Sequence, residues 1–408
     1  MTYPVMTAAD VAAAEPLYRK AQLLASAAAR AKRNNAFTRG VMSSPPTVTA
    51  NGTTNPLSAS VNKSVLSNAS VFTTAGSFYF SGGVYRLKTA KIGATGGNLG
   101  LNDGSQCSAG RISVMIDSTK VAFRVMPTTA KYRFLVNGQY VDMAGTQTAA
   151  TTGNTHEYIL LDFTSAGGKA TREIAIEMQS ACGLVGVYAD AAGRIYPLPK
   201  SSAFLRGVAV GDSYIGGNTQ MSALGNLYCL QMADHLGIDL MMASGSGGTK
   251  WAADNAGALS FGNRIAAGDI GLIGAAPDYV FLMASINDSA SLGSAITANS
   301  AAAIQFIRNT YPNALIFCFG CYDPTGGSNA TPYQASENAF FAGVDASGVT
   351  KGIAKIPITT DADGSWITSG NKADIIGADN THMGDAGNAT AGLWQANAVV
   401  RALASMTF

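Results

Sequence analysis

The spacing of apolar residues divides the chain into three stretches with different patterns. Residues 11–33 are rich in Ala, which predicts a helix, and Pro16 would suit a first turn if the helix began later. One face of this helix carries small apolar side chains: Leu17, Ala21, Leu24 and Ala28. The face is thin, so the helix needs a partner. Residues 34–64 are rich in Ser, Thr, Asn and Pro, which predicts an extended linker.

From about residue 65 to residue 200 the period of the apolar residues changes to two. Short alternating segments lie at 77–80, 111–116, 121–125, 132–136, 157–163, 173–177 and 184–188. Asn137-Gly138 is a strong hairpin signal, because both residues tolerate the positive φ of the tight turns that join strands. Short strands with regular turns predict an all-β sandwich in this stretch.

After residue 200, apolar strands alternate with helical segments. Strands are expected at 208–210, 238–243, 279–284, 314–320 and 355–359, and helices at 222–236, 292–311, 332–344 and 385–403. Near-continuous apolar strands with helices between them predict a parallel sheet covered on both faces, an α/β fold. The expected organisation is therefore a helix and linker at 1–64, a β-sandwich at 65–200 and an α/β domain at 201–408.

Composition and charge narrow the classes of partner and compartment. The 408 residues suit two or three domains, and 47% of them are apolar. A net charge of +2 with 13% charged residues disfavours nucleic acid and anionic membranes, and the apolar runs are too short to span a bilayer. The first residues lack the pattern of a secretory signal peptide. The surface expected from abundant Gly, Ala, Ser and Thr is typical of extracellular or virion proteins; the alternative is a cytoplasmic location.

The five cysteines predict neither a full disulfide framework nor a metal centre. Their number is odd, and Cys318-Phe-Gly-Cys321 has no second pair to complete a zinc site. Ordinary buried thiols are expected there, although a disulfide stays open. Cys107 and Cys182 both fall in the β-rich stretch and could pair. No metal and no cofactor is predicted.

Polar and small residues follow each strand of the predicted parallel sheet. These groups are Gly211-Asp212-Ser213, Ser244 to Thr249, Ser285-Ile-Asn287-Asp288 and, near the C-terminus, Asp379-Asn-Thr-His382. Ligands of such sheets bind beyond the carboxyl ends of the strands, so the groups are expected to meet there. Each group alone is a weak signal: the first arises often by chance, the third could be a turn, and a single histidine is more often structural. The four together, in this order, are a strong one.

Together these residues supply what acyl transfer needs. Ser213 can attack a carbonyl if His382 takes its proton, and Asp379 can orient the other ring nitrogen. The expected oxyanion donors are the backbone N–H groups of Ser213 and Gly247 and the side-chain amide of Asn287. Glycine at 247 lets the backbone approach a substrate closely.

This set of motifs resembles the SGNH (GDSL-like) hydrolases over residues 203–408. The resemblance implies a flavodoxin-like three-layer α/β/α fold and the same roles for the five residues just named. Two positions depart from the family pattern: Ser285 stands where Gly is usual, and Met383 follows the histidine where Pro is usual. The departures put the loop shape in doubt, including whether Gly245 rather than Gly247 points its N–H inward.

The order of the domains resembles carbohydrate esterases that remove O-acetyl groups, in which a jelly-roll-like domain precedes the SGNH domain. It is also similar to phage tail proteins that deacetylate surface glycans. The implied partner is an O-acetylated polysaccharide. Candidate substrate-binding residues are the aromatic side chains near the site, each of which could instead be packing: Tyr214, Trp251 and Trp366.

Two other functions stay open at this point. The chain could be a glycan-binding or virion-structural protein with a vestigial hydrolase domain, although retention of all five positions speaks against decay. It could also hydrolyse lipid esters or thioesters, although no long apolar lid is evident near the motifs. For a virion protein, the N-terminal helix could serve attachment or trimerisation.

Overall fold

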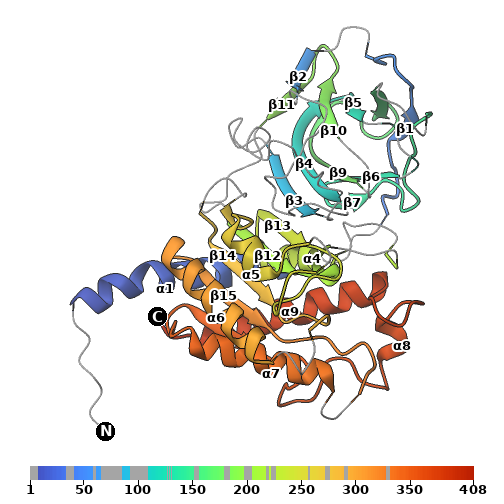
Figure 1. Ribbon diagram of the computed structural model, residues 1–408. Helices are drawn as coiled ribbons and strands as arrows, with labels where there is room; N and C mark the ends of the chain where they lie inside the picture. The colour runs from blue at the N-terminus through green and yellow to red at the C-terminus, as the bar shows by residue number, and fades with distance from the viewer. Residues whose placement is uncertain are drawn as a thin grey trace.

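The computed structural model contains a five-stranded parallel array covered by helices and, beside it, two antiparallel sheets (Figure 1). It describes residues 8–33, 41–57, 61–65, 85–91, 109–125, 127, 129, 131–150, 156–178, 184–196, 205–216, 220–221, 227–255, 258–271, 276–288, 293–327 and 331–408. The expected strand at 77–80, as well as Cys107 and Cys182, lies outside these residues. In the described part of the chain, no helix combines the length and the hydropathy needed to cross a bilayer.

The parallel strands follow the order β16-β15-β14-β12-β13. Their bounds are Arg206–Gly211 for β12, Leu240–Gly245 for β13, Tyr279–Met283 for β14, Leu315–Phe319 for β15 and Ile353–Ile356 for β16. The four inner strands are apolar and buried along almost their whole length, as a sheet covered on both faces requires. The order runs in opposite directions on either side of β12, so a topological switch point lies at its carboxyl end. The α/β expectation is thus confirmed.

Helices cover both faces of this array. One face carries α1 (Ala8–Arg33), α4 (Tyr228–Leu236) and α9 (Asp385–Ser405), and the other carries α5 (Phe261–Ala266), α6 (Gly293–Thr310) and α7 (Pro332–Ala346). Two short helices, α3 (Ser213–Gly216) and α8 (Lys372–Ile375), lie at the loops. Helix α7 starts where the sequence predicts, because the Thr331 side chain caps the N–H of Gln334 and Pro332 fits the first turn.

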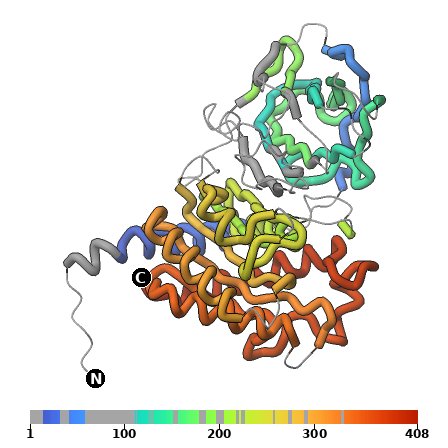
Figure 2. Tube along the Cα trace, in the orientation of Figure 1, coloured from blue at the N-terminus to red at the C-terminus, as the bar shows by residue number. Residues whose placement is uncertain are grey.

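The N-terminal helix is part of the α/β body. Its apolar stripe (Leu17, Ala21, Leu24 and Ala28) is buried in one hydrophobic cluster with α4 and α9. The chain trace shows the blue part of this helix running into the yellow, orange and red part of the chain (Figure 2). It begins at Ala8, so Pro16 lies inside the helix rather than in its first turn. The stripe therefore finds its partner within the chain, and a role of the helix in attachment or trimerisation stays a prediction.

The antiparallel strands form two sheets that share a core. The first sheet holds β1 (Thr47–Ala50), β8 (Glu157–Asp162), β5 (Lys120–Val125), β10 (Leu184–Ala189) and β2 (Val61–Val65). The second holds β3 (Tyr85–Lys91), β4 (Ala109–Ser118), β9 (Ala170–Met178), β6 (Tyr132–Val136) and β7 (Gln139–Tyr140), with β11 (Arg194–Tyr196) on β4. Phe123 of β5 packs on Phe134 of β6 with ring centroids 5.0 Å apart. This is a sandwich; its jelly-roll character stays a prediction.

Several local features differ from the sequence-based expectation. The predicted linker contains two strands, since β1 pairs with β8 and β2 pairs with β10. The last parallel strand ends at Ile356 instead of residue 359. Beyond it, the N–H groups of residues 358–360 donate to the buried carboxylate of Glu337 rather than to a strand. The Asn137-Gly138 turn is confirmed, with φ of 48° and 83°.

The sandwich and the α/β part share one continuous sheet. Strand β3 pairs with β13 in parallel and with β4 antiparallel, so hydrogen bonds cross the expected boundary at residue 200. Arg111 of β4 also spans this boundary: it binds Glu177 of β9 at 2.6 Å and Asp234 of α4 at 2.9 Å. Sequence patterns do not reveal the pairing of β3 with β13 or the contact of Arg111 with Asp234, because each pair lies more than 100 residues apart in the chain.

Candidate active site

Ser213 lies at the carboxyl end of β12, as the first residue of α3. The turn that presents it is tight, because a Cβ on Gly211 would lie 2.4 Å from Ile215 Cγ1. Asp212, the residue before Ser213, is buried, and its Oδ1 accepts the N–H of Tyr214 at 3.0 Å. The serine side chain itself is half-buried and remains accessible.

His382 and Asp379 complete a chain of contacts with Ser213. The Nε2 of His382 lies 2.8 Å from Ser213 Oγ, and its Nδ1 lies 2.7 Å from Asp379 Oδ2. The backbone N–H groups of Thr381 and His382 both donate to Asp379 Oδ1. Partial burial would raise the pKa of Asp379, but the hydrogen bonds from His382 and Thr381 outweigh it, so this pKa is lowered. An ionised Asp379 favours the tautomer in which Nε2 accepts the serine proton.

The loop that carries the histidine is fixed at both ends. Residues Ile376 and Met383 form an antiparallel bridge, and the N–H of Gly377 donates to the carbonyl of His382 at 2.7 Å. Met383, where the family usually has Pro, is buried in the core beneath this loop. The Met383 side chain, packed in the core, therefore takes the position of the proline ring that is usual in SGNH hydrolases.

The structure separates the roles of the two glycines that the sequence left open. A Cβ on Gly245 would lie 1.9 Å from the backbone N of Gly216, so this glycine lets β13 pack against α3. A Cβ on Gly247 would instead point toward Ser213, 4.0 Å from its Cβ. Gly247 is also exposed, so its backbone borders the open space beside Ser213.

Asn287 lies close to the same point, in the turn after β14. Its side-chain Nδ2 lies 3.0 Å from the carbonyl of Thr249 and 3.4 Å from Asp212 Oδ2. The amide therefore bridges the glycine-rich turn and the turn that carries Ser213. Three of the five positions predicted for chemistry, His382, Gly247 and Asn287, thus lie against Ser213 or Asp212, and Asp379 reaches Ser213 through His382.

Two of the three predicted substrate contacts are wrong, because their side chains are in the core. Trp251 is 0% exposed; its Nε1 donates to the carbonyl of Met283 at 2.9 Å, and its ring packs between Phe261 and Phe340. Tyr214 is 2% exposed, and its hydroxyl donates to the carbonyl of Thr381. Neither ring can stack on a sugar. Tyr214 instead holds the loop of His382 through its hydrogen bond to Thr381.

Trp366 is half-buried and belongs to a row of aromatic rings that continues to Trp394. Its ring packs on Tyr322, which stacks on Tyr214, which in turn packs on His382, with centroids 5.6–6.2 Å apart. The indole N–H donates to Asp361. Trp366 thus belongs to the same structural row as the histidine and retains an exposed edge.

A buried arginine beneath the site is absent from the sequence-based prediction. Arg264 of α5 is 0% exposed and donates to the carbonyls of Gly211 and Ser244, at 3.0 and 2.8 Å. It thereby ties together the carboxyl ends of β12 and β13. Asp269 lies 3.5 Å from its Nε and also accepts the hydroxyl of Ser244. Burial lowers the pKa of Arg264, against the opposing effect of Asp269.

The three cysteines that the structure describes take no part in this site. Cys229, Cys318 and Cys321 are free and buried. Burial raises the pKa of all three thiols, that of Cys229 to about 12, so they are protonated and unreactive near neutral pH. Among the described residues, no group of acidic, histidine or cysteine side chains is arranged to hold a metal ion.

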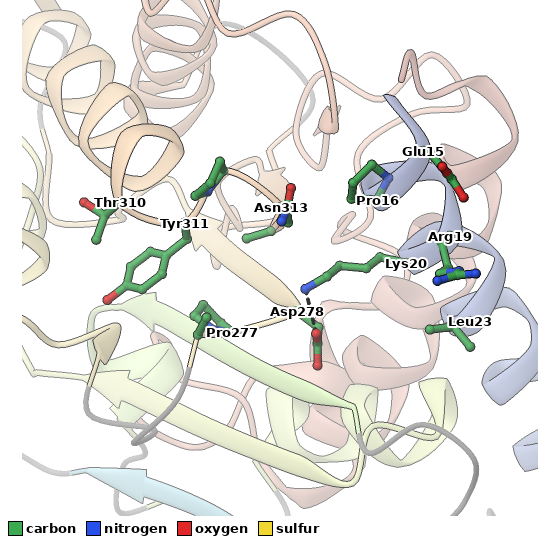
Figure 3. A pocket seen from close by; sticks show the side chains of 13 residues that line it. Glu15, Pro16, Arg19, Lys20, Leu23, Pro277, Asp278, Thr310, Tyr311 and Asn313 are labelled. Carbon is green, nitrogen blue, oxygen red and sulfur yellow. Dashed lines mark hydrogen bonds and ion pairs between the residues drawn. The ribbon is translucent and has the colours of Figure 1, made fainter. Parts of the chain in front are cut away.

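A groove of about 460 Å³ lies at the opposite edge of the parallel sheet, between α1 and the segments that enter β14 and β15 (Figure 3). Pro16, Tyr311 and Asn313 line it, and the ion pair of Lys20 with Asp278, 2.7 Å long, crosses it. It contains none of the residues predicted for chemistry. The candidate active site is therefore at the carboxyl edge, as the topology predicts.

Comparison with solved structures relates the fold to a defined group of enzymes. A family two carbohydrate esterase from Clostridium thermocellum, solved as an active-site mutant, matches with a TM-score of 0.51 at 12% identity, over 71% of this chain and 90% of its own. An acetyl xylan esterase from Butyrivibrio proteoclasticus matches with a TM-score of 0.52 at 12% identity, over 83% and 97%. The chain therefore shares the fold of these carbohydrate esterases.

The match extends beyond the α/β part. Residues 201–408 make up about half of the chain, whereas the acetyl xylan esterase matches 83% of it. The β-sandwich is therefore part of the likeness. A salicylyl-acyltransferase from a tetracycline biosynthetic pathway matches with a TM-score of 0.51 at 14% identity, over 72% of this chain and 82% of its own. No protein-family profile and no curated protein sequence matches the chain.

Proposed function

We propose that the protein is a serine esterase that removes O-acetyl groups from a polysaccharide. The observation that carries the proposal is the continuous set of contacts from Asp379 through His382 to Ser213, with distances of 2.7 and 2.8 Å. These are the distances at which a base can take a proton from a serine hydroxyl and a carboxylate can stabilise the resulting imidazolium.

The geometry supports a two-step acyl transfer. Ser213 Oγ attacks the acetyl carbonyl while its proton moves to His382 Nε2, and the N–H groups of Ser213 and Gly247 with the Asn287 amide stabilise the oxyanion. When the intermediate collapses, the bond to the sugar oxygen breaks, and His382 returns the proton to that oxygen. Water then attacks the acetyl-enzyme with His382 as base, which releases acetate and restores Ser213.

Two observations favour a carbohydrate ester over a lipid. The matched solved structures include enzymes named as acetyl xylan and carbohydrate esterases, one of them in complex with cellohexaose. The side chains of Asp379 and His382 are 31% and 22% exposed, so the site lies at the surface, where a polymer can reach it. A glycan deacetylase carried on a virion or acting outside a cell also fits the charge-poor composition, and this location is part of the proposal.

Acyl transfer to an acceptor other than water is a second candidate function. A salicylyl-acyltransferase shares the fold, and the acyl-enzyme step is common to both reactions. Adding an alcohol or a sugar acceptor to the assay separates the two, because a transferase forms the new ester while releasing less acid.

The deciding experiment measures acetate release from acetylated xylans, acetylated bacterial surface polysaccharides and p-nitrophenyl acetate. Wild type should release acetate, and Ser213→Ala should not. Ser405→Ala, at the exposed end of α9, is the matched control and should behave as wild type.

Two other outcomes would favour different functions. If Ser213→Ala releases as much acetate as wild type, or if a fluorophosphonate probe leaves Ser213 unlabelled while glycan binds, the enzyme proposal is wrong and a binding function is favoured. A preference for long p-nitrophenyl esters over the acetate would instead favour a lipid substrate.

A further inference from the structure

The hydroxyl of Ser285 lies where three loops of the site meet. Ser285 follows β14 and is completely buried. Its Oγ is 2.8 Å from Asp212 Oδ2, beside the nucleophile, and 3.0 Å from the carbonyl of Thr249, in the glycine-rich turn. The same oxygen accepts the backbone N–H of Asn287 at 3.0 Å. One side chain thus contacts each segment that would form the oxyanion site.

The Ser285 hydroxyl is the closest donor to Oδ2 of Asp212. The Asp212 carboxylate is buried, and its Oδ2 also faces the N–H of Ile286 at 3.3 Å and the amide of Asn287 at 3.4 Å. The Ser285 hydroxyl is the shortest of these contacts. A hydroxyl has a single proton, and a carboxylate attracts it more strongly than the Thr249 carbonyl does. Burial raises the pKa of Asp212, and the bonds from Tyr214, Ser285 and Ile286 oppose that rise.

The consequence concerns the amide of Asn287. Its Nδ2 lies 3.0 Å from the Thr249 carbonyl and 3.4 Å, a long distance, from Asp212 Oδ2. An amide has two N–H bonds, so each acceptor can take one of them. An oxyanion donor must have an N–H that can turn to the substrate oxygen. Because Ser285 supplies Asp212 with a close donor, the second N–H of Asn287 is held weakly and is available.

We propose that Ser285 is a positioning residue for the oxyanion site: its hydroxyl occupies Asp212 and holds the backbone of Asn287, which keeps one amide N–H of Asn287 available for the reacting carbonyl oxygen. This inference rests on the proposed esterase function. It also gives a role to a departure from the family pattern, because the Gly that is usual at this position has no side chain to do either.

The first test compares Ser285→Ala with Ser300→Ala. Ser300 is an equally buried serine whose hydroxyl donates to the carbonyl of Ile296 within α6 rather than to a residue predicted for chemistry. We expect Ser285→Ala to lower kcat on p-nitrophenyl acetate by about 10- to 100-fold, less than the loss of a direct oxyanion donor, with KM within about twofold of wild type. Ser300→Ala should lower Tm without changing kcat. Ser285→Gly repeats the test in case the alanine variant does not fold.

The second test asks whether Ser285 acts through Asn287. In a double-mutant cycle, Ser285→Ala should cost much less in an Asn287→Ala background than in wild type, because the group that it positions is already gone. An equal loss in both backgrounds would overturn the inference, as would a kcat within about twofold of wild type in both Ser285 variants.

The outcome for wild type separates this inference from the proposed function. If wild type hydrolyses the ester but the Ser285 variants behave as wild type, only the role of Ser285 is wrong. If wild type hydrolyses no ester, the proposed function and this inference both fail.

Discussion

Asp379 holds His382 at two points, because one carboxylate oxygen lies 2.7 Å from the ring Nδ1 and the other accepts the backbone N–H at 2.8 Å. Both contacts arise within four residues of chain. The carboxylate therefore fixes the shape of the loop as well as the orientation of the ring, and a change at this residue affects both.

Replacing Asp379 with Asn should separate these two effects. An amide at this position can stabilise the wrong tautomer and cannot balance the imidazolium charge, so kcat should fall by about 10³- to 10⁴-fold while KM changes little. Initial rates on p-nitrophenyl acetate measure this effect. A loss of less than tenfold would show that His382 works without the carboxylate.

Asp379→Asn should also change how the free energy of unfolding depends on pH. The pKa of Asp379 lies below its ordinary value of 3.8, so folding favours its ionised form. The stabilisation is present above about pH 3.8 and is lost as pH falls through the lowered pKa. Denaturant unfolding should therefore show wild type more stable than Asp379→Asn at neutral pH, and this difference should shrink as the pH falls below 3.8.

Gly245, which ends β13, and Gly247, in the turn after it, should respond in different ways to a methyl group. Gly245→Ala places a Cβ 1.9 Å from the backbone of Gly216, which cannot retreat, so unfolding should become easier by about 3 kcal/mol or more. Gly247→Ala meets Ser213 Cβ at 4.0 Å, so the protein should fold normally but lose about tenfold or more in kcat/KM. Thermal melts and ester kinetics on both variants test this; similar melting temperatures would contradict it.

The sequence predicted the site better than its surroundings, for a physical reason. Ser213, Asn287 and His382 each follow an apolar strand or lie in a recognisable motif, and parallel topology brings such strand ends together. The parallel strands and the main helices follow from the same local patterns, whereas the order of the strands in the sheet comes from the structure alone. In contrast, the pairing of β3 with β13 joins segments about 150 residues apart, and no local pattern specifies it.

Burial was the property that the sequence did not reveal. Trp251 and Tyr214 were candidates for stacking on a sugar, with packing as the alternative, and tertiary packing places both in the core. Arg264 was missed for the opposite reason. An arginine in a polar segment is usually solvated, and only the fold shows that this one lies beneath two strand ends.

The aromatic residues should therefore separate stability from substrate binding. Trp251→Phe leaves the Met283 carbonyl without its 2.9 Å donor and opens a small cavity, so it should cost about 1–3 kcal/mol of stability with KM unchanged. Trp366→Ala removes a partly exposed ring and should raise KM for acetylated polysaccharide but not for p-nitrophenyl acetate. If Trp251→Phe changes the KM for polysaccharide instead, the buried position does not exclude a role in binding.

Arg264 provides the last prediction. Arg264→Met removes the donors that hold the carbonyls of Gly211 and Ser244, and it leaves Asp269 buried without its cation, so we expect a loss of about 3–5 kcal/mol in unfolding free energy. The double variant Arg264→Met with Asp269→Leu should recover part of this stability, because no unpaired charge remains. Its kcat should stay low, because the carbonyls of Gly211 and Ser244 still lack the donor that links the two strand ends beside Ser213. Recovery of both stability and kcat would show that the arginine only compensates Asp269.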